Sequence, residues 1–352
     1  MLRRAIAATL FVVLMSASLV SASDREAQQP GAQALPDSPE PSLQSAQELA
    51  ARGRLDQALA QLNQLAAQSP EPPGVERLRG IIFYQKEQFP DAIAAFSKAE
   101  TQQPNDRESM EMHGVSLFRL GRAAEAIPYL EKAHAAVERT NADPDYVLAL
   151  CYADVQRYDD SRHAFAAQYG FPPDSAEAYL LAARMFFRRE LRDQARAAAM
   201  KALELNPRLP LAHELLGEVA LAKAEVPGAI QELEAERKIN PLDAGLYDRL
   251  GDAYLRNEQF TDAQKALDRA VLLEPNSTGP YILLGRTFLK LNQPIEALHY
   301  LLHAAQMDPS NHLTHYFLGQ AYRATGQVDE ANRELKMVGN LQNNGAPSAR
   351  GK

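Results

Sequence analysis

The sequence lacks several features that enzymes and nucleic-acid-binding proteins commonly carry. It has one cysteine, Cys151, and no tryptophan. A single thiol cannot form an internal disulfide, so packing must hold the fold, and we expect Cys151 to be a small buried core residue. No phosphate-binding glycine loop, zinc-protease signature or Gly-x-Ser-x-Gly turn is present. The formal net charge of −8 argues against a nucleic-acid partner.

A long apolar run occurs only near the N-terminus. Arg3 and Arg4 precede an apolar stretch from Ala5 to Val20, and small residues follow it. This order is typical of a secretory signal peptide, which we predict over residues 1–22. The stretch is somewhat short for a membrane span, although an uncleaved anchor is the alternative. We therefore expect an exported protein, in the periplasm or secreted, with no membrane insertion after signal cleavage.

Both ends of the chain next to this segment and after the main body are polar. Residues 23–41 are rich in proline, glutamine and charge, with almost nothing to bury. We predict a disordered linker there and a disordered tail over residues 342–352. The region between them, residues 42–341, has the composition of a folded array.

Prolines recur at a fixed interval within this region. Pro173, Pro207, Pro241, Pro275 and Pro309 follow one another every 34 residues. A period of this length is typical of stacked helical arrays. Because proline cannot continue a helix, each of these prolines is predicted to follow the last helix of a unit.

Other residues keep the same interval. Counting back from Pro275, one unit starts at Ala244 and the next at Thr278, and large, small and aromatic residues recur at matching places. These are Tyr247, Leu250, Gly251, Tyr254, Ala263, Leu267 and Ala270 in the first unit, and Tyr281, Leu284, Gly285, Phe288, Ala297, Leu301 and Ala304 in the second. Offsets of three and four place the large residues on one helix face, and the small ones are expected where two helices cross closely.

This pattern resembles the tetratricopeptide repeat (TPR). The resemblance implies an all-α fold, a right-handed α-solenoid of about nine stacked helix-turn-helix repeats that start near residues 39, 73, 107, 142, 176, 210, 244, 278 and 312. It also implies a non-enzymatic scaffold without a cofactor, whose partners are other proteins or peptides.

Several residues depart from the repeat pattern. Glu236 stands at a small-alanine position, so we expect a loosened unit or a carboxylate that reaches outward. Pro128 falls inside a second helix and should kink its first turn. Pro90, Pro227 and Pro294 fall near the first turn of second helices, where proline is tolerated.

The resemblance also indicates a binding groove. In this family the groove is lined mainly by positions 2, 5, 9, 12 and 13 of each first helix. The partner-binding residues implied at these positions are Arg77, Ile81, Tyr84, Phe118, Arg119, Tyr146, Arg184, Phe187, Arg188, Arg286, Lys290, Tyr316 and Arg323. Arg184 and Arg188 around Phe187 would suit a peptide with a carboxylate and an apolar anchor. The alternative is that these are the charges any exposed helix face carries.

Known specialised grooves of the family do not fit. Chaperone-binding members have an asparagine at position 9, and sugar-transferase members have an asparagine ladder at position 6, and this sequence has neither. The preferred interpretation is a scaffold or adaptor in cell-envelope assembly, secretion or polysaccharide export.

A histidine cluster supports an alternative function. His299 and His303 are four residues apart on a predicted helix, so both rings share one face. Two such histidines can chelate a transition metal, which would make the chain a metal- or small-ligand-binding envelope protein. The competing interpretation is that both are ordinary polar residues of a repeat junction.

The last predicted helix has no following unit to cover it. Leu335, Val338 and Leu341 would lie on its uncovered face. A homo-oligomer formed through this face is therefore a further hypothesis.

Overall fold

The computed structural model describes residues 41–135 and 145–345. All regular structure in these residues is α-helical, in eighteen helices that alternate as the first and second members of nine pairs. This confirms the all-α repeat prediction. The predicted signal peptide lies outside the described residues, as does the predicted linker apart from Pro41. The chain divides at Gly170 into two compact units.

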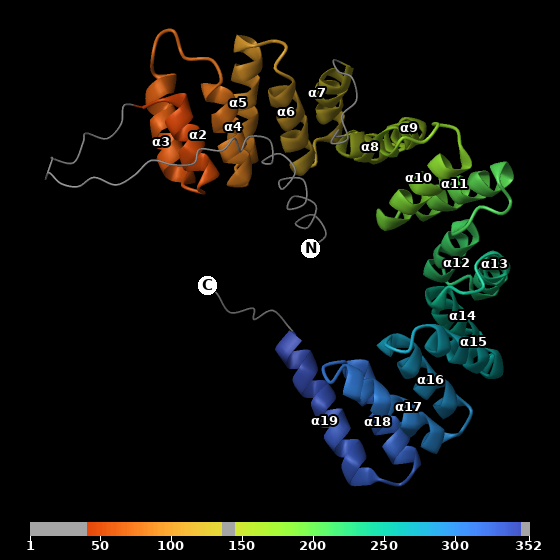
Figure 1. Ribbon diagram of the computed structural model, residues 1–352. Coiled ribbons are helices and arrows are strands. Elements are labelled where there is room, and N and C mark those ends of the chain that lie inside the picture. The colour runs from red at the N-terminus through yellow and green to blue at the C-terminus, as the bar shows by residue number, and fades with distance from the viewer. Residues whose placement is uncertain (1–40, 136–144, 346–352) are drawn as a thin grey trace, which may run out of the picture. The chain divides into compact units, whose positions relative to one another are not determined.

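Each unit is a series of helix pairs (Figure 1). Unit 1 contains α2 (Leu43–Ala51), α3 (Leu55–Ala66), α4 (Val75–Gln85), α5 (Phe89–Gln102), α6 (Arg107–Arg119), α7 (Ala123–Ala135), α8 (Asp145–Asp154) and α9 (Tyr158–Tyr169). Unit 2 contains α10 (Ala176–Arg188), α11 (Arg192–Leu205), α12 (Ala212–Ala222), α13 (Val226–Ile239), α14 (Ala244–Arg256), α15 (Phe260–Leu273), α16 (Thr278–Lys290), α17 (Pro294–Met307), α18 (His312–Ala324) and α19 (Val328–Gly345). Within each unit, consecutive helices pack against each other.

Glycine allows the two helices of a pair to cross closely. A Cβ atom on Gly251 would lie 2.4 Å from Leu267 of the paired helix, and one on Gly285 would lie 2.3 Å from Leu301. Real Cβ contacts are never this short, so a larger residue would force the helices or the leucine to move. The predicted role of small residues at the crossings is confirmed.

The prolines lie where the interval predicts. Pro207, Pro241, Pro275 and Pro309 each come directly after the C-cap residue of a second helix. The second helices α5, α13 and α17 carry their prolines in the first turn, where the backbone N–H has no partner to lose. Helix α7 continues through Pro128.

Glu236 corrects one sequence expectation. Leu211, the N-cap residue of α12, has a φ of 69° and provides no side-chain cap. The fully buried Glu236 takes that role, because its Oε1 accepts a hydrogen bond from the Leu211 N–H at 2.8 Å and its Oε2 one from the Glu214 N–H at 3.3 Å. The prediction of an outward carboxylate was wrong. A helix N-terminus with unpaired N–H groups stabilises a buried carboxylate instead.

The remaining features concern the core and the C-terminal end. Cys151 is fully buried, as expected. Helix α19 continues to Gly345, so the array extends past the predicted boundary at residue 341. Leu335 of α19 packs below Gly319, while the Met337 side chain is 43% exposed. None of the described helices is both long and apolar enough to span a bilayer.

Candidate functional site

We call the side of the first helices that carries repeat positions 2, 5, 9, 12 and 13 the inner face. On the inner face of α10, α12 and α14, charged side chains pair with one another. Arg184 of α10 lies 3.8 Å from Glu218 of α12, and the Nε of Arg249 on α14 lies 2.8 Å from the other oxygen of Glu218. Arg249 also lies 3.3 Å from Glu214. This row of alternating charges links three consecutive first helices, so Arg184 is not the free cation that the sequence suggested.

Two carboxylates on this inner face have perturbed titration. Burial raises the pKa of Glu214, which is 4% exposed, although Arg249 partly offsets the effect. Burial, and then the charge of Asp252, raises the pKa of Asp248. Both groups hold a negative charge on the inner face at some cost, which disfavours a further anion beside them.

The inner face of α16 and α18 is different. Arg286 and Lys290 of α16 and Arg323 of α18 form no ion pair with any residue that the structure describes. Tyr316 of α18 is 43% exposed beside them. We call Arg286, Lys290, Arg323 and Tyr316 the basic face. An acidic segment could pair with three cations there without displacing an internal carboxylate.

Unit 1 contains a separate aromatic and basic cluster. The guanidinium of Arg119 lies 4.8 Å from the ring centre of Phe89 and 5.8 Å from that of Tyr84. The two rings meet edge to face at 5.5 Å, and Arg119 donates a hydrogen bond of 3.4 Å to the Tyr84 hydroxyl. These contacts fix Arg119 in place, because its cation is shared between two ring faces.

Arg77 also has internal partners. Its Nη1 lies 3.4 Å from Asp106, and its Nε lies 3.5 Å from Glu108. The three side chains line an open hollow of about 590 Å³ beside the α5–α6 loop. Arg77 therefore lies next to open space, but acidic groups of the protein already occupy its guanidinium.

The apolar groove residues are mostly part of the packing. Phe187 packs against the buried residues Ala183 and Ala199, so it is not a free apolar anchor. Tyr146 meets the fully buried Phe165 edge to face at 5.8 Å. Ile81 and Phe118 are half-buried, and Arg188 is exposed. The sequence placed these residues on the correct helices, but it could not separate groove-facing side chains from packed ones.

The histidine pair lies on the surface of α17. His299 and His303 are both exposed, and the His303 ring lies 4.6 Å from that of Tyr281. In the described part of the chain, no three His, Cys, Asp or Glu side chains come together as metal ligands would. His315 is instead a structural residue, with its Nδ1 2.6 Å from Glu334.

Sequence reasoning missed Arg249, which holds Glu214 and Glu218. It occupies position 6 of its repeat, one place outside the set used to define the groove. A long side chain reaches beyond its own position, so positions adjacent to the groove set were the signal that was available.

Comparisons with known proteins agree with this architecture. Models of the tetratricopeptide repeat match residues 43–107, 77–144 and 249–278, residues 288–350, and residues 176–209. The chain belongs to the tetratricopeptide repeat family. A comparison with curated protein sequences gave no match.

Several solved structures are similar. YrrB, described as a TPR protein with an unusual peptide-binding site, is 23% identical over 52% of this chain and 95% of its own, with a TM-score of 0.46. MamA from Desulfovibrio magneticus RS-1 is 19% identical over 49% of this chain and 98% of its own, with a TM-score of 0.47. PilF of Pseudomonas aeruginosa is 19% identical over 50% of this chain and 78% of its own, with a TM-score of 0.43.

Proposed function

We propose that this TPR protein is a non-enzymatic scaffold that binds acidic segments of partner proteins on the inner face of unit 2. The observation that supports it is the basic face, where Arg286, Lys290 and Arg323 have no acidic partner among the described residues. A protein that used these positions only for stability would pair them, as it pairs Arg184 and Arg249. Unpaired cations next to an exposed tyrosine are the typical composition of a recognition surface.

The proposal includes a place of action. The signal-like segment over residues 1–22 supports export, and a repeat array that offers a binding surface suits a role in cell-envelope assembly, secretion or polysaccharide export. Fractionation of cells that produce the full chain, compared with a chain lacking residues 1–22, tests this part. Equal amounts of both chains in the cytoplasm would exclude export.

A peptide titration tests the binding proposal. We expect the full chain to bind the blocked, labelled peptide acetyl-Asp-Leu-Glu-Leu-amide more tightly than its Asn/Gln isostere in fluorescence anisotropy. The triple substitution Arg286→Gln, Lys290→Gln and Arg323→Gln should weaken binding roughly tenfold or more, because hydrogen bonds to charged groups are lost.

The matched control removes a cation elsewhere in the same unit. Arg192→Gln, on the exposed surface of α11, should leave the affinity within about twofold of wild type, since screening limits distant charges. Equal affinity of the triple variant and the wild type would refute the basic face as the binding site.

A further inference from the structure

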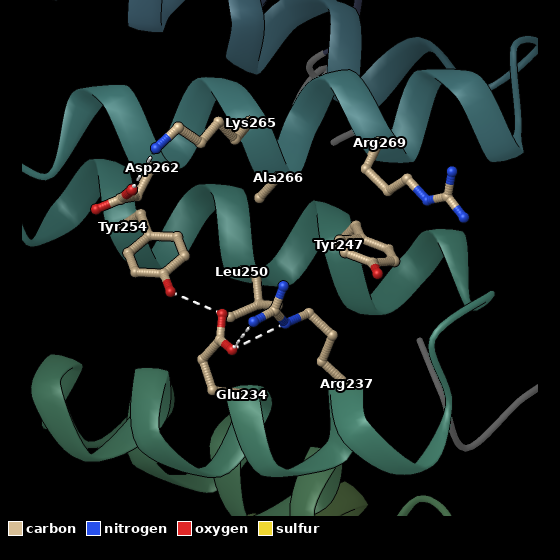
Figure 2. A pocket seen from close by; sticks show the side chains of 9 residues that line it. All are labelled: Glu234, Arg237, Tyr247, Leu250, Tyr254, Asp262, Lys265, Ala266 and Arg269. Carbon is tan, nitrogen blue, oxygen red and sulfur yellow. Dashed lines mark hydrogen bonds and ion pairs between the residues drawn. The ribbon is translucent and has the colours of Figure 1, made fainter.

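A second candidate site lies on the opposite side of α14 from the inner face. Figure 2 shows a trough with α14 as its floor and α13 and α15 as its two walls. Tyr247, Leu250 and Tyr254 of α14 form the floor, and the cavity measures about 320 Å³. These three residues occupy repeat positions 4, 7 and 11, so none belongs to the groove set of this family.

One end of the trough is internally neutralised. The Tyr254 hydroxyl donates a hydrogen bond of 2.7 Å to Glu234, and the Arg237 Nε donates one of 2.8 Å to the same carboxylate. The Nζ of Lys265 lies 3.3 Å from Asp262 across from them. Burial and the Glu234 bond raise the pKa of Tyr254, so its hydroxyl remains a donor at neutral pH. Each cation at this end already has a carboxylate.

The other end has an unmatched cation. Arg269 extends from α15 beside Tyr247 (Figure 2) and forms no ion pair with any described residue. Local sequence explains the difference. Arg237 and Lys265 each have an acid three residues earlier, which is a favourable spacing on a helix, whereas Ala266 precedes Arg269 at that spacing.

Other repeats use the position of Arg269 differently. Lys98 and Lys201 are 171 and 68 residues earlier, five and two intervals of 34 apart from a single offset residue. Lys98 lies 2.7 Å from Glu71 and 2.8 Å from Glu76, and Lys201 lies 2.7 Å from Glu204. Stacking of the repeats therefore does not require an unpaired cation at this place.

The centre of the trough is apolar and narrow. Leu250 is 1% exposed and Ala266 is 7% exposed, so together they form a small buried surface between the two polar ends. A volume of about 320 Å³ is near the lower limit for ligand pockets, about 300 Å³, which fits one or two amino-acid residues.

We propose that this trough binds a short acidic peptide segment, with a carboxylate on Arg269 and a small apolar residue against Leu250 and Ala266. Glu234 and Asp262 at the opposite end repel a second carboxylate, which sets the direction of the segment. An arginine guanidinium matches a carboxylate through two parallel hydrogen bonds. The site is independent of the basic face and adds a second binding surface to the scaffold.

The test follows the arginine Nε–H signals of the ¹⁵N-labelled full chain by nuclear magnetic resonance, with Arg269→Gln used to assign the Arg269 signal. The probes are acetyl-Ala-Glu-amide, its isostere acetyl-Ala-Gln-amide, and inorganic phosphate. We expect a saturable shift of the Arg269 signal with the glutamate probe, roughly tenfold weaker binding of the glutamine probe, and loss of this preference in Arg269→Gln.

Two controls separate this site from the basic face. Arg192→Gln and the triple variant of Arg286, Lys290 and Arg323 should both keep the preference for the glutamate probe at the Arg269 signal. The proposal is overturned if the Arg269 signal does not saturate, or if the two peptides bind equally well. Phosphate binding tighter than that of the glutamate probe would also overturn it, because the site would then recognise phosphate rather than a peptide carboxylate.

Discussion

Two parts of unit 2 have the same cation at the same repeat position and use it differently. Arg184 of α10 and Arg286 of α16 are 102 residues apart, three intervals of 34. The next first helix offers Glu218 to Arg184 but Gln320 to Arg286. Arg184 lies 3.8 Å from its glutamate, whereas Arg286 has no ion pair within the described residues. A carboxylate or an amide on the neighbouring helix therefore decides whether an inner-face cation is structural or available to a partner.

The helix crossings of the same repeats also differ. Gly285 lies against Leu301 in α16 and α17, whereas Ala183 and Ala199 occupy the two matching places in α10 and α11. All of the alanines at this crossing and Leu301 are fully buried. The volume of the crossing is thus divided between the two helices in two ways, and a change on one side requires a change on the other.

The largest expected effect comes from altering this crossing. Gly285→Ala adds a Cβ atom 2.3 Å from Leu301, and we expect it to lower the free energy of unfolding by about 1–2 kcal/mol. Adding Leu301→Ala gives the alanine pair of α10 and α11, so the double variant should be more stable than the sum of the single effects predicts. Thermal unfolding of the four proteins measures this, and strictly additive effects would contradict the shared-volume explanation.

A smaller effect is expected from exchanging the acid and the amide. Gln320→Glu should place a carboxylate beside Arg286, as Glu218 lies beside Arg184, and weaken binding of the acidic peptide about fivefold. Anisotropy titrations with acetyl-Asp-Leu-Glu-Leu-amide measure the change. Gln306→Glu makes the same charge change on the exposed surface of α17 and is the control. A similar loss in both variants would mean that only net charge matters.

The smallest effect concerns pH and compares His315 with the tyrosines at its repeat position. Tyr247 and Tyr281 donate hydrogen bonds of 3.1 Å to the carbonyls of Pro241 and Pro275. The His315 Nε2 lies 2.9 Å from the Pro309 carbonyl, and its Nδ1 lies 2.6 Å from Glu334. Because both partners accept hydrogen bonds, the arrangement favours the imidazolium, which donates from both nitrogens.

Burial alone would lower the pKa of His315, but the bonds to Glu334 and Pro309 outweigh it and raise the pKa above the ordinary value of 6.5. The resulting stabilisation is complete below 6.5 and is lost as the pH rises through the pKa of the folded state. The melting temperature should therefore fall by about 2 °C or less between pH 6 and pH 8. His315→Tyr should remove this dependence, and an unchanged pH profile in that variant would exclude His315 as its source.

Much of the architecture was predictable from residue spacing. Prolines 34 residues apart predicted where the second helices of unit 2 end, since a proline at that place cannot continue a helix whatever surrounds it. Gly251 and Leu267 predicted a close crossing, because only a residue without a Cβ atom fits below a leucine there. Such local constraints recur in every repeat, so they are visible without coordinates.

Contacts between neighbouring helices were not predictable in the same way. Glu236 was misjudged because its role depends on the unpaired N–H groups at Leu211, which lie 25 residues away along the chain. Arg184 was assigned to a peptide because its pairing with Glu218 depends on how the next helix packs. Arg269 received no role, because the groove set considers only first helices.

Repeat length, helix pairing and family membership were thus determined by the sequence alone, because steric limits on proline and glycine act within a few residues. Only the tertiary structure decided which charges are already neutralised and which remain for a ligand. The physical reason is that an ion pair depends on a distance of a few ångströms between side chains of different helices, and residue spacing along the chain does not specify that distance.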